Sequence, residues 1–451
     1  MIPVYTHYLN PSDYGTLELL QLILDVLALL AGFRLSDAVI RYYHHYKSPE
    51  DKIQVISTAF LFSSLVSILA VVICQFLVTP VSILVFNESR HASYLVWIFV
   101  CLGYELFFIV PEAFLIVNKK AIVYSSLSFT TFFLAMSLNI YFLVVLGMGI
   151  WGMIYSMVIT KTVYLILLLI FVIPGISFSF SISKLKEMLA FGLPLLPGVL
   201  AMFIINFSDR FFIQQYCTSA DLGIYSLGYK FGTLLVVLMT DPFFRIWNTQ
   251  RFEIAPRKDG SIIFGRYFTY YLMGLVTLAL GLCMFSQNII LIMADQQFQG
   301  SAVIIPLIAI SYIFQGLAGF STLGIMISYR TSYILYANLG MALVNIALNF
   351  ILIRNFGIYG AAVSTIISYA FLFLVLISLS QRLYPISFEV SRIVKLVILT
   401  FLVYGLSTMV QNHTLISIGV KALVLLLLPL GLYASRFFTK TELEKIRAVF
   451  S

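Results

Sequence analysis

Long apolar runs fill most of the chain, and short polar segments separate them. The runs are continuous, whereas the strands of a membrane barrel alternate apolar and polar positions over about ten residues. Each run has roughly the twenty residues that a membrane helix needs. The pattern predicts helices over 16–43, 53–78, 92–117, 121–146, 150–173, 189–216, 222–248, 264–293, 302–328, 332–353, 358–380, 393–410 and 415–437. With an apolar stub at 1–8 we expect about fourteen spans.

The stub is too short to cross a bilayer. As a helix it would rise ~12 Å, against a hydrocarbon core of ~30 Å. The later run at 189–216, which ends on the matching tyrosine, has roughly 20 more residues before it. We therefore expect either that the natural start lies upstream or that the first span is incomplete in this chain.

Two copies of one plan are visible along the sequence. The framework of Tyr8 to Gly15 recurs 208 positions later as Tyr216 to Gly223, and Gly149-Ile150-Trp151-Gly152 recurs at the same offset as Gly357-Ile358-Tyr359-Gly360. Each copy holds six spans, so both have the same orientation. We expect an N-terminal lobe at 1–183, a C-terminal lobe at 184–391, and an extra helix pair with a tail at 392–451.

Composition supports a membrane protein, since 61% of the residues are hydrophobic and 10% are charged. Four single cysteines form no disulfide or zinc pattern, so we expect free thiols and no metal site. The net charge of +8 comes from basic residues between spans, which does not indicate nucleic acid binding. Nineteen basic loop residues fall on one side and only Arg90 and Arg354 on the other. This bias predicts that both termini are cytoplasmic.

Charged residues inside spans are functional candidates because they are costly in lipid. By helical rise, Asp25, Glu105 and Lys161 lie near mid-membrane and Lys230 in the outer third. Neither lysine has an acidic residue three or four positions away in its own span. Each therefore needs a partner from another helix, from water or from an anionic substrate.

Other charges have plainer interpretations that compete with function. Arg34, Asp37 and Arg41 share a helix face, as do Asp241 and Arg245, and such sets can be neutralised structural ion pairs. Near the outer surface, Asp209, Arg210 and Lys421 can extend to the interface. The tyrosines Tyr225 and Tyr229 next to Lys230 either pack in the protein or line a sugar-accepting cavity.

The order of several motifs resembles a known family. Asp13-Tyr14-Gly15, Ser208-Asp209-Arg210, and Gly223-Ile224-Tyr225 leading to Gly228-Tyr229-Lys230 are similar to the polysaccharide transporter family of O-antigen-type flippases, as is Gly357 to Ala362. That family belongs to the multidrug, oligosaccharidyl-lipid and polysaccharide exporter superfamily. The resemblance implies an all-α fold with two six-helix lobes around a central cavity of alternating access.

The resemblance also implies the substrate, an undecaprenyl-diphosphate-linked glycan carried across the inner (cytoplasmic) membrane for lipopolysaccharide O-antigen synthesis. We expect Lys161 and Lys230 to contact the headgroup. Arg34, Arg41 and Arg245 would collect the diphosphate at the cytoplasmic mouth. Asp25 or Glu105 would bind a coupling proton or sodium ion. No cofactor is expected, and the chain is expected to act as a monomer among membrane lipids.

Alternatives of three classes remain open: another transporter of the same superfamily, a membrane enzyme and a structural scaffold. A cation-coupled multidrug exporter and a lipid II flippase belong to the same superfamily. A membrane glycan polymerase or ligase needs outward catalytic residues on a substantial loop, and the loops here are short, with isolated histidines. A scaffold would not need intramembrane lysines without local partners. We therefore expect a transporter and no enzymatic activity.

Overall fold

The computed structural model describes residues 1–177, 179–410, 415–439 and 442–444, and every regular element in these ranges is helical. The chain forms two compact units, Met1–Gly223 and Ile224–Ser451. The predicted all-α fold is confirmed. The lobe boundary predicted at 183 follows the sequence repeat and stays a prediction, whereas the division at 223 describes packing.

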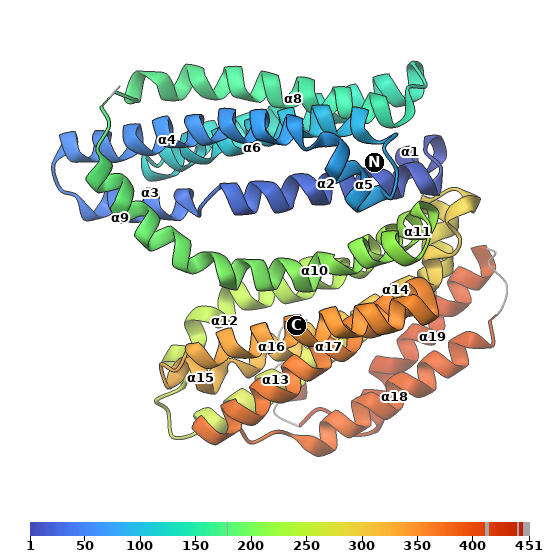
Figure 1. The fold of residues 1–451 in the computed structure, drawn as a ribbon. Coiled ribbons are helices and arrows are strands. Elements are labelled where there is room, and N and C mark those ends of the chain that lie inside the picture. The colour runs from blue at the N-terminus through green and yellow to red at the C-terminus, as the bar shows by residue number, and fades with distance from the viewer. Residues whose placement is uncertain (178, 411–414, 440–441, 445–451) are drawn as a thin grey trace. The chain divides into compact units, whose positions relative to one another are not determined.

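Ten helices, α1 to α10, lie in the first unit and are coloured blue to green in Figure 1. They are α1 (Ile2–Tyr8), α2 (Pro11–Ala31), α3 (Leu35–His45), α4 (Pro49–Phe76), α5 (Val78–Phe86), α6 (Ala92–Val117), α7 (Ala121–Ile140), α8 (Gly149–Val172), α9 (Ile182–Gly192) and α10 (Leu196–Tyr216).

The helix α11 (Ser219–Gly232) carries the chain into the second unit. The helices that follow are α12 (Asp241–Ile254), α13 (Gly260–Met293), α14 (Ser301–Ser321), α15 (Leu323–Ile327), α16 (Ser332–Leu348), α17 (Arg354–Leu383), α18 (Val390–Thr408) and α19 (Leu415–Ala434). Here α18 and α19 pack against each other and against α13. The last helix pair is thus part of the second unit.

Twelve helical segments within the described ranges are long and apolar enough to cross a membrane. One of them, Ser332–Leu383, contains a break at Gly357 that separates the two spans predicted at 332–353 and 358–380. The chain is therefore a multi-pass membrane protein. The seven-residue helix α1 occupies the predicted N-terminal stub.

The sequence repeat reappears in backbone geometry. A π-helical turn at Tyr141–Val145 precedes Gly149, and another at Asn349–Ile353 precedes Gly357, again 208 positions later. Both glycines have positive φ, 54° and 57°. At Gly357 the φ of 57° combines with a ψ of −138°, a pair of angles that residues with a Cβ rarely adopt, so glycine is favoured at this corner.

A second pair of repeat-related glycines is in direct contact. A Cβ on Gly15 in α2 would lie 2.0 Å from the carbonyl oxygen of Ser219 in α11, and a Cβ on Gly223 would lie 2.0 Å from that of Pro11. The first turns of α2 and α11 therefore cross with their backbones touching. Asn10 caps α2 by accepting a bond of 2.8 Å from the Asp13 N–H, which fixes where this helix begins.

Two local features were not visible in the hydrophobic pattern. The span expected at 16–43 lies within the membrane-length segment Pro11–His45, and inside it α2 and α3 are separated where Phe33 and Arg34 adopt left-handed backbone angles. The segment between the spans predicted at 53–78 and 92–117 contains the apolar helix α5. Hydrophobic periodicity detects neither a two-residue break inside an apolar run nor a helix shorter than a span.

Ion pairs connect α13 and α18 to the C-terminal residues. Arg392 on α18 pairs with Glu389 at 2.9 Å and with Glu442 at 3.1 Å, and Arg266 on α13 lies 3.5 Å from Glu442. Burial alone would raise the pKa of the Glu442 carboxyl. Bonds from the Thr439 N–H, from Tyr270 and from Arg392 outweigh burial and hold this pKa below its ordinary value.

We expect Glu442→Gln to lower the free energy of unfolding by about 1 to 3 kcal/mol at pH 7, because bonds to a charged group are lost. Because the pKa of the Glu442 carboxyl is lowered in the folded state, its charge stabilises the protein at pH values above the ordinary pKa of 4.5. This stabilisation disappears as the pH falls through the folded-state pKa. The variant and the natural protein should therefore converge at low pH in thermal unfolding of the purified protein. The exposed Glu444→Gln is the control, and an equal loss there would contradict the assignment.

Candidate functional site

Three helices of the first unit, α2, α6 and α8, pack together and bring the predicted mid-membrane charges into one place. The ammonium of Lys161 on α8 forms an ion pair with the Glu105 carboxylate on α6. The partner that Lys161 lacks on its own helix is thus supplied by a neighbouring helix. The two residues lie 56 positions apart in the sequence.

This ion pair is only partly shielded from its surroundings. The side chain of Lys161 is 17% exposed and that of Glu105 is 39% exposed. A fully buried pair would be locked in place, because removing either partner would leave an uncompensated charge. Half-buried Glu105 instead keeps one side open, so an incoming anion or cation can compete for the pair.

Asp25 on α2 completes the site. Its carboxylate accepts a hydrogen bond of 2.8 Å from the Gln21 amide, one helical turn earlier. It also interacts electrostatically with both Glu105 and Lys161. Two carboxylates and one ammonium therefore share a small region of the membrane interior, with one acidic group in excess.

Hydrogen bonds between α6 and α8 hold the two charged side chains in register. The hydroxyls of Tyr104 and Thr162, each adjacent in sequence to one member of the ion pair, lie 2.9 Å apart. Further along the same helices, Tyr164 donates to Glu112 at 2.8 Å. Sequence reasoning missed Tyr104, Thr162, Tyr164 and Gln21, although the spacing of Gln21 and Asp25, four apart, is a detectable helical signal.

At the junction of α2 and α3, Arg34 pairs with Asp37 at 2.6 Å. Arg41, on the same helix α3, instead places its guanidinium 4.3 Å from the ring centre of Phe191 on α9. The structural interpretation of a neutralised pair therefore fits Arg34. The exposed Arg41 retains its charge for other contacts.

The candidates of the second unit do not form one cluster. Lys230 is exposed on α11, whereas Tyr225 and Tyr229 are 0% and 4% exposed. Their rings pack against each other, and Tyr229 also packs against Tyr312. Their burial favours packing over the lining of a sugar cavity. Arg245 is exposed on α12, and no ion pair joins it to Asp241 among the residues described.

Three charges expected at the interface are buried instead. Asp209 and Arg210 are 1% and 4% exposed and pair with each other at 3.2 Å. Lys421 is 5% exposed and donates to the Asn288 side chain at 3.0 Å. Position along a helix does not show which neighbours cover each face, so it did not predict that these side chains are buried.

Chemically, the Asp25, Glu105 and Lys161 site suits reversible binding. A carboxylate that exchanges between an ammonium partner and a proton or metal cation changes the net charge of the site by one. An ammonium released from its carboxylate can bind an oxyanion.

A family model described as "Polysaccharide biosynthesis protein" matches residues 5–248, which is more than half of the chain. This range includes Asp25, Glu105, Lys161 and Lys230. No curated protein sequence matches the chain.

Solved structures of membrane transporters share the fold. The chain is similar to a lipid II flippase MurJ in an inward closed conformation, with a TM-score of 0.71, 14% identity, and coverage of 96% of this chain and 95% of that chain. A multidrug resistance MATE family transporter of the MOP superfamily in an inward-facing conformation has a TM-score of 0.64 and 13% identity, with coverage of 84% of this chain and 92% of that chain. For a mutant of the Vibrio cholerae MATE transporter VcmN, the TM-score is 0.53 and the identity 14%, with coverage of 82% of this chain and 94% of that chain.

Proposed function

Because the chain belongs to the polysaccharide biosynthesis protein family, we propose that it is a flippase that moves an undecaprenyl-diphosphate-linked oligosaccharide across the membrane. The single observation that carries this proposal is the half-buried Glu105 and Lys161 ion pair next to Asp25. The family match and the transporter fold support a transporter or flippase of this superfamily. Oligosaccharide export for surface polysaccharide, including O-antigen, is the finer part of the proposal.

The physical task of such a flippase is to replace water around a charged headgroup. A diphosphate with sugars cannot enter hydrocarbon unaided, whereas the polyprenyl tail can stay in lipid throughout. Basic side chains within the spans compensate the phosphate charge. We assign headgroup contact to Lys161 in the first unit and to Lys230 in the second, and initial capture to Arg41, Arg34 and Arg245.

Exchange at the ion pair couples substrate to a cation in this proposal. An arriving diphosphate replaces Glu105 as the ion-pair partner of Lys161. The released Glu105 carboxylate then binds a proton or a sodium ion, with Asp25 beside it. Charge is thereby balanced at each stage inside the low-dielectric interior. Departure of the substrate restores the original pair and expels the cation.

We place the protein in the cytoplasmic membrane, and the distribution of basic loop residues supports an orientation with both termini inside. In this orientation Arg41 lies on the cytoplasmic side, where the lipid-linked oligosaccharide is assembled. The exposed position of Arg41 at the end of α3 is consistent with capture of a diphosphate. The proposal requires neither a cofactor nor a covalent step.

Reconstitution tests this function directly. Purified protein in vesicles should move a fluorescent undecaprenyl-diphosphate oligosaccharide between leaflets, measured by the fraction that becomes accessible to an impermeant quencher. Lipid II and a cationic dye, supplied separately, should move no faster than in protein-free vesicles. Movement of lipid II alone would identify a lipid II flippase, and export of the dye alone would identify a multidrug exporter. Either result would contradict the proposal.

A further inference from the structure

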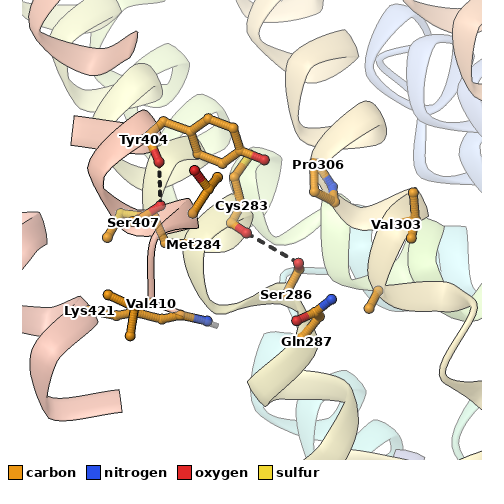
Figure 2. A pocket seen from close by; sticks show the side chains of 12 residues that line it. Cys283, Met284, Ser286, Gln287, Val303, Pro306, Tyr404, Ser407, Val410 and Lys421 are labelled. Carbon is orange, nitrogen blue, oxygen red and sulfur yellow. Dashed lines mark hydrogen bonds between the residues drawn. The ribbon is translucent and has the colours of Figure 1, made fainter. Parts of the chain in front are cut away.

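A cavity of about 400 Å³ lies within the second unit among α13, α14, α18 and α19 (Figure 2). It is separate from the charged site of the first unit. Its lining includes Ser286, Gln287, Val303, Tyr404 and Lys421. No acidic residue is among the described residues that line it, and Lys421 is the basic one.

Lys421 is the charged group of this cavity and is nine-tenths buried, with 5% of its surface exposed. Figure 2 shows its side chain reaching from α19 toward the α13 side of the cavity, where Ser286 and Gln287 lie. The ammonium donates to the Asn288 side-chain oxygen at 3.0 Å. An ammonium has three donors, and within the described part of the chain no carboxylate pairs with it. A buried ammonium with only a neutral amide partner is poorly compensated.

Other polar groups of the cavity, and the Asn288 amide beside Lys421, can also donate hydrogen bonds. The buried Asn288 nitrogen has no partner among the described residues. The Gln287 amide and the Tyr404 hydroxyl belong to the lining and can donate as well. A concave site with one buried cation, several neutral donors and no acid is suited to an oxyanion.

The surroundings indicate that this oxyanion is attached to a lipid. The cavity lies near the ends of its helices, with Lys421 six residues into α19, or about 9 Å by helical rise. At such a depth, lipid headgroups meet the hydrocarbon core. Apolar side chains nearby remain exposed, including Val303 at 49%, Leu406 at 45% and Val420 at 39%. They offer contact surface to acyl chains, which a free anion would not use.

The volume of this cavity distinguishes it from a site that holds a transported glycan. A volume of about 400 Å³ is at the small end of the roughly 300 to 1,000 Å³ typical of small-molecule sites. It accommodates a phosphate with a small headgroup, but not a chain of several sugars. We propose that this cavity binds the phosphate headgroup of an anionic membrane lipid, with Lys421 as its charged anchor. This lipid is a resident of the protein and not its transported substrate.

Native mass spectrometry of the purified chain tests the proposal. Dioleoyl phosphatidic acid should bind Lys421→Gln at least about tenfold more weakly than the natural protein, because a bond to a charged group is lost. Lys395→Gln is the matched control, since it removes a lysine from the opposite end of the same helix pair, where its ammonium donates to the Ser435 carbonyl at 2.9 Å. Lys421→Arg keeps the charge and should retain most of the binding.

Two further arms identify the ligand. Dioleoylglycerol, which has no phosphate, should not bind at this site, and inorganic phosphate should not displace phosphatidic acid at equal concentration. Equal lipid binding by natural protein and Lys421→Gln would overturn the proposal, as would equal binding of dioleoylglycerol. Displacement by inorganic phosphate would overturn the lipid assignment. A melting temperature is recorded for each variant, to show that a loss of binding comes from a folded protein. If Lys421→Gln does not fold, the result from Lys421→Arg decides. Full loss of binding by Lys421→Arg would then reject Lys421 as the anchor.

Discussion

Alanine at Gly15 or Gly223 is expected to lower strongly the amount of folded, membrane-inserted protein. In each case the added Cβ would lie 2.0 Å from a backbone carbonyl oxygen of the other helix. Backbone cannot move aside as a side chain can, so α2 and α11 must separate. We expect each substitution to lower the free energy of unfolding by about 3 kcal/mol, the upper end of the overpacking range. Thermal unfolding of purified variants and membrane abundance measure the effect.

Gly405→Ala in α18 is the matched control, because a Cβ there has no atom within 4 Å. It should be neutral or stabilising by up to about 1 kcal/mol, since alanine restricts the unfolded chain. The double variant Gly15→Ala with Gly223→Ala should lose less than the sum of the two single losses, because one separation of the helices relieves both clashes. Strictly additive losses would show that the two glycines do not share a contact.

Reversal of the charge at Lys161 is expected to abolish oligosaccharide export. Lys161→Glu would place a third carboxylate beside Glu105 and Asp25 and remove the proposed headgroup contact. An uncompensated charge at a span centre costs about 2.5 to 3.5 kcal/mol, which corresponds to roughly a hundredfold change in the equilibrium for insertion of the helix into the membrane. Export of surface polysaccharide in a strain lacking its own copy, with protein abundance measured in parallel, gives the result. Lys161→Arg should retain part of the activity, since it keeps the charge but changes its geometry.

A variant in which Lys161 and Glu105 exchange places distinguishes a role of the ion pair in transport from a role in the fold alone. If the ion pair only stabilises the fold, Lys161→Glu combined with Glu105→Lys should restore both abundance and export. We expect it to restore abundance alone, because the headgroup ligand and the cation-binding carboxylate would have changed places. Because Lys230 is exposed on α11, Lys230→Glu should stop export while the abundance of the protein stays normal. The control is Lys258→Glu in an exposed loop, and an equal loss of export there would point to general surface charge.

The sequence by itself was sufficient for the fold class and for the internal repeat. Span lengths follow from the thickness of the bilayer, so uninterrupted apolar runs predict membrane helices without knowledge of any contact. The 208-residue offset also anticipated that Gly149 and Gly357 are equivalent, and both have positive φ. A glycine at a required backbone angle is a local property, so it is visible in the sequence. The same order of motifs predicted the family.

Contacts between helices were decided only in the tertiary structure. The helical spacing rule compares residues three or four apart, so it could not pair Lys161 with Glu105, 56 positions away, or bury Lys421 against Asn288. Likewise the motif containing Gly15 and Gly223 was recognisable as a repeat, but its reason, the crossing of two backbones, was not. Along one helix, apolar residues facing lipid and apolar residues facing protein look alike. Which face meets which neighbour depends on how side chains from distant spans fill the space between helices.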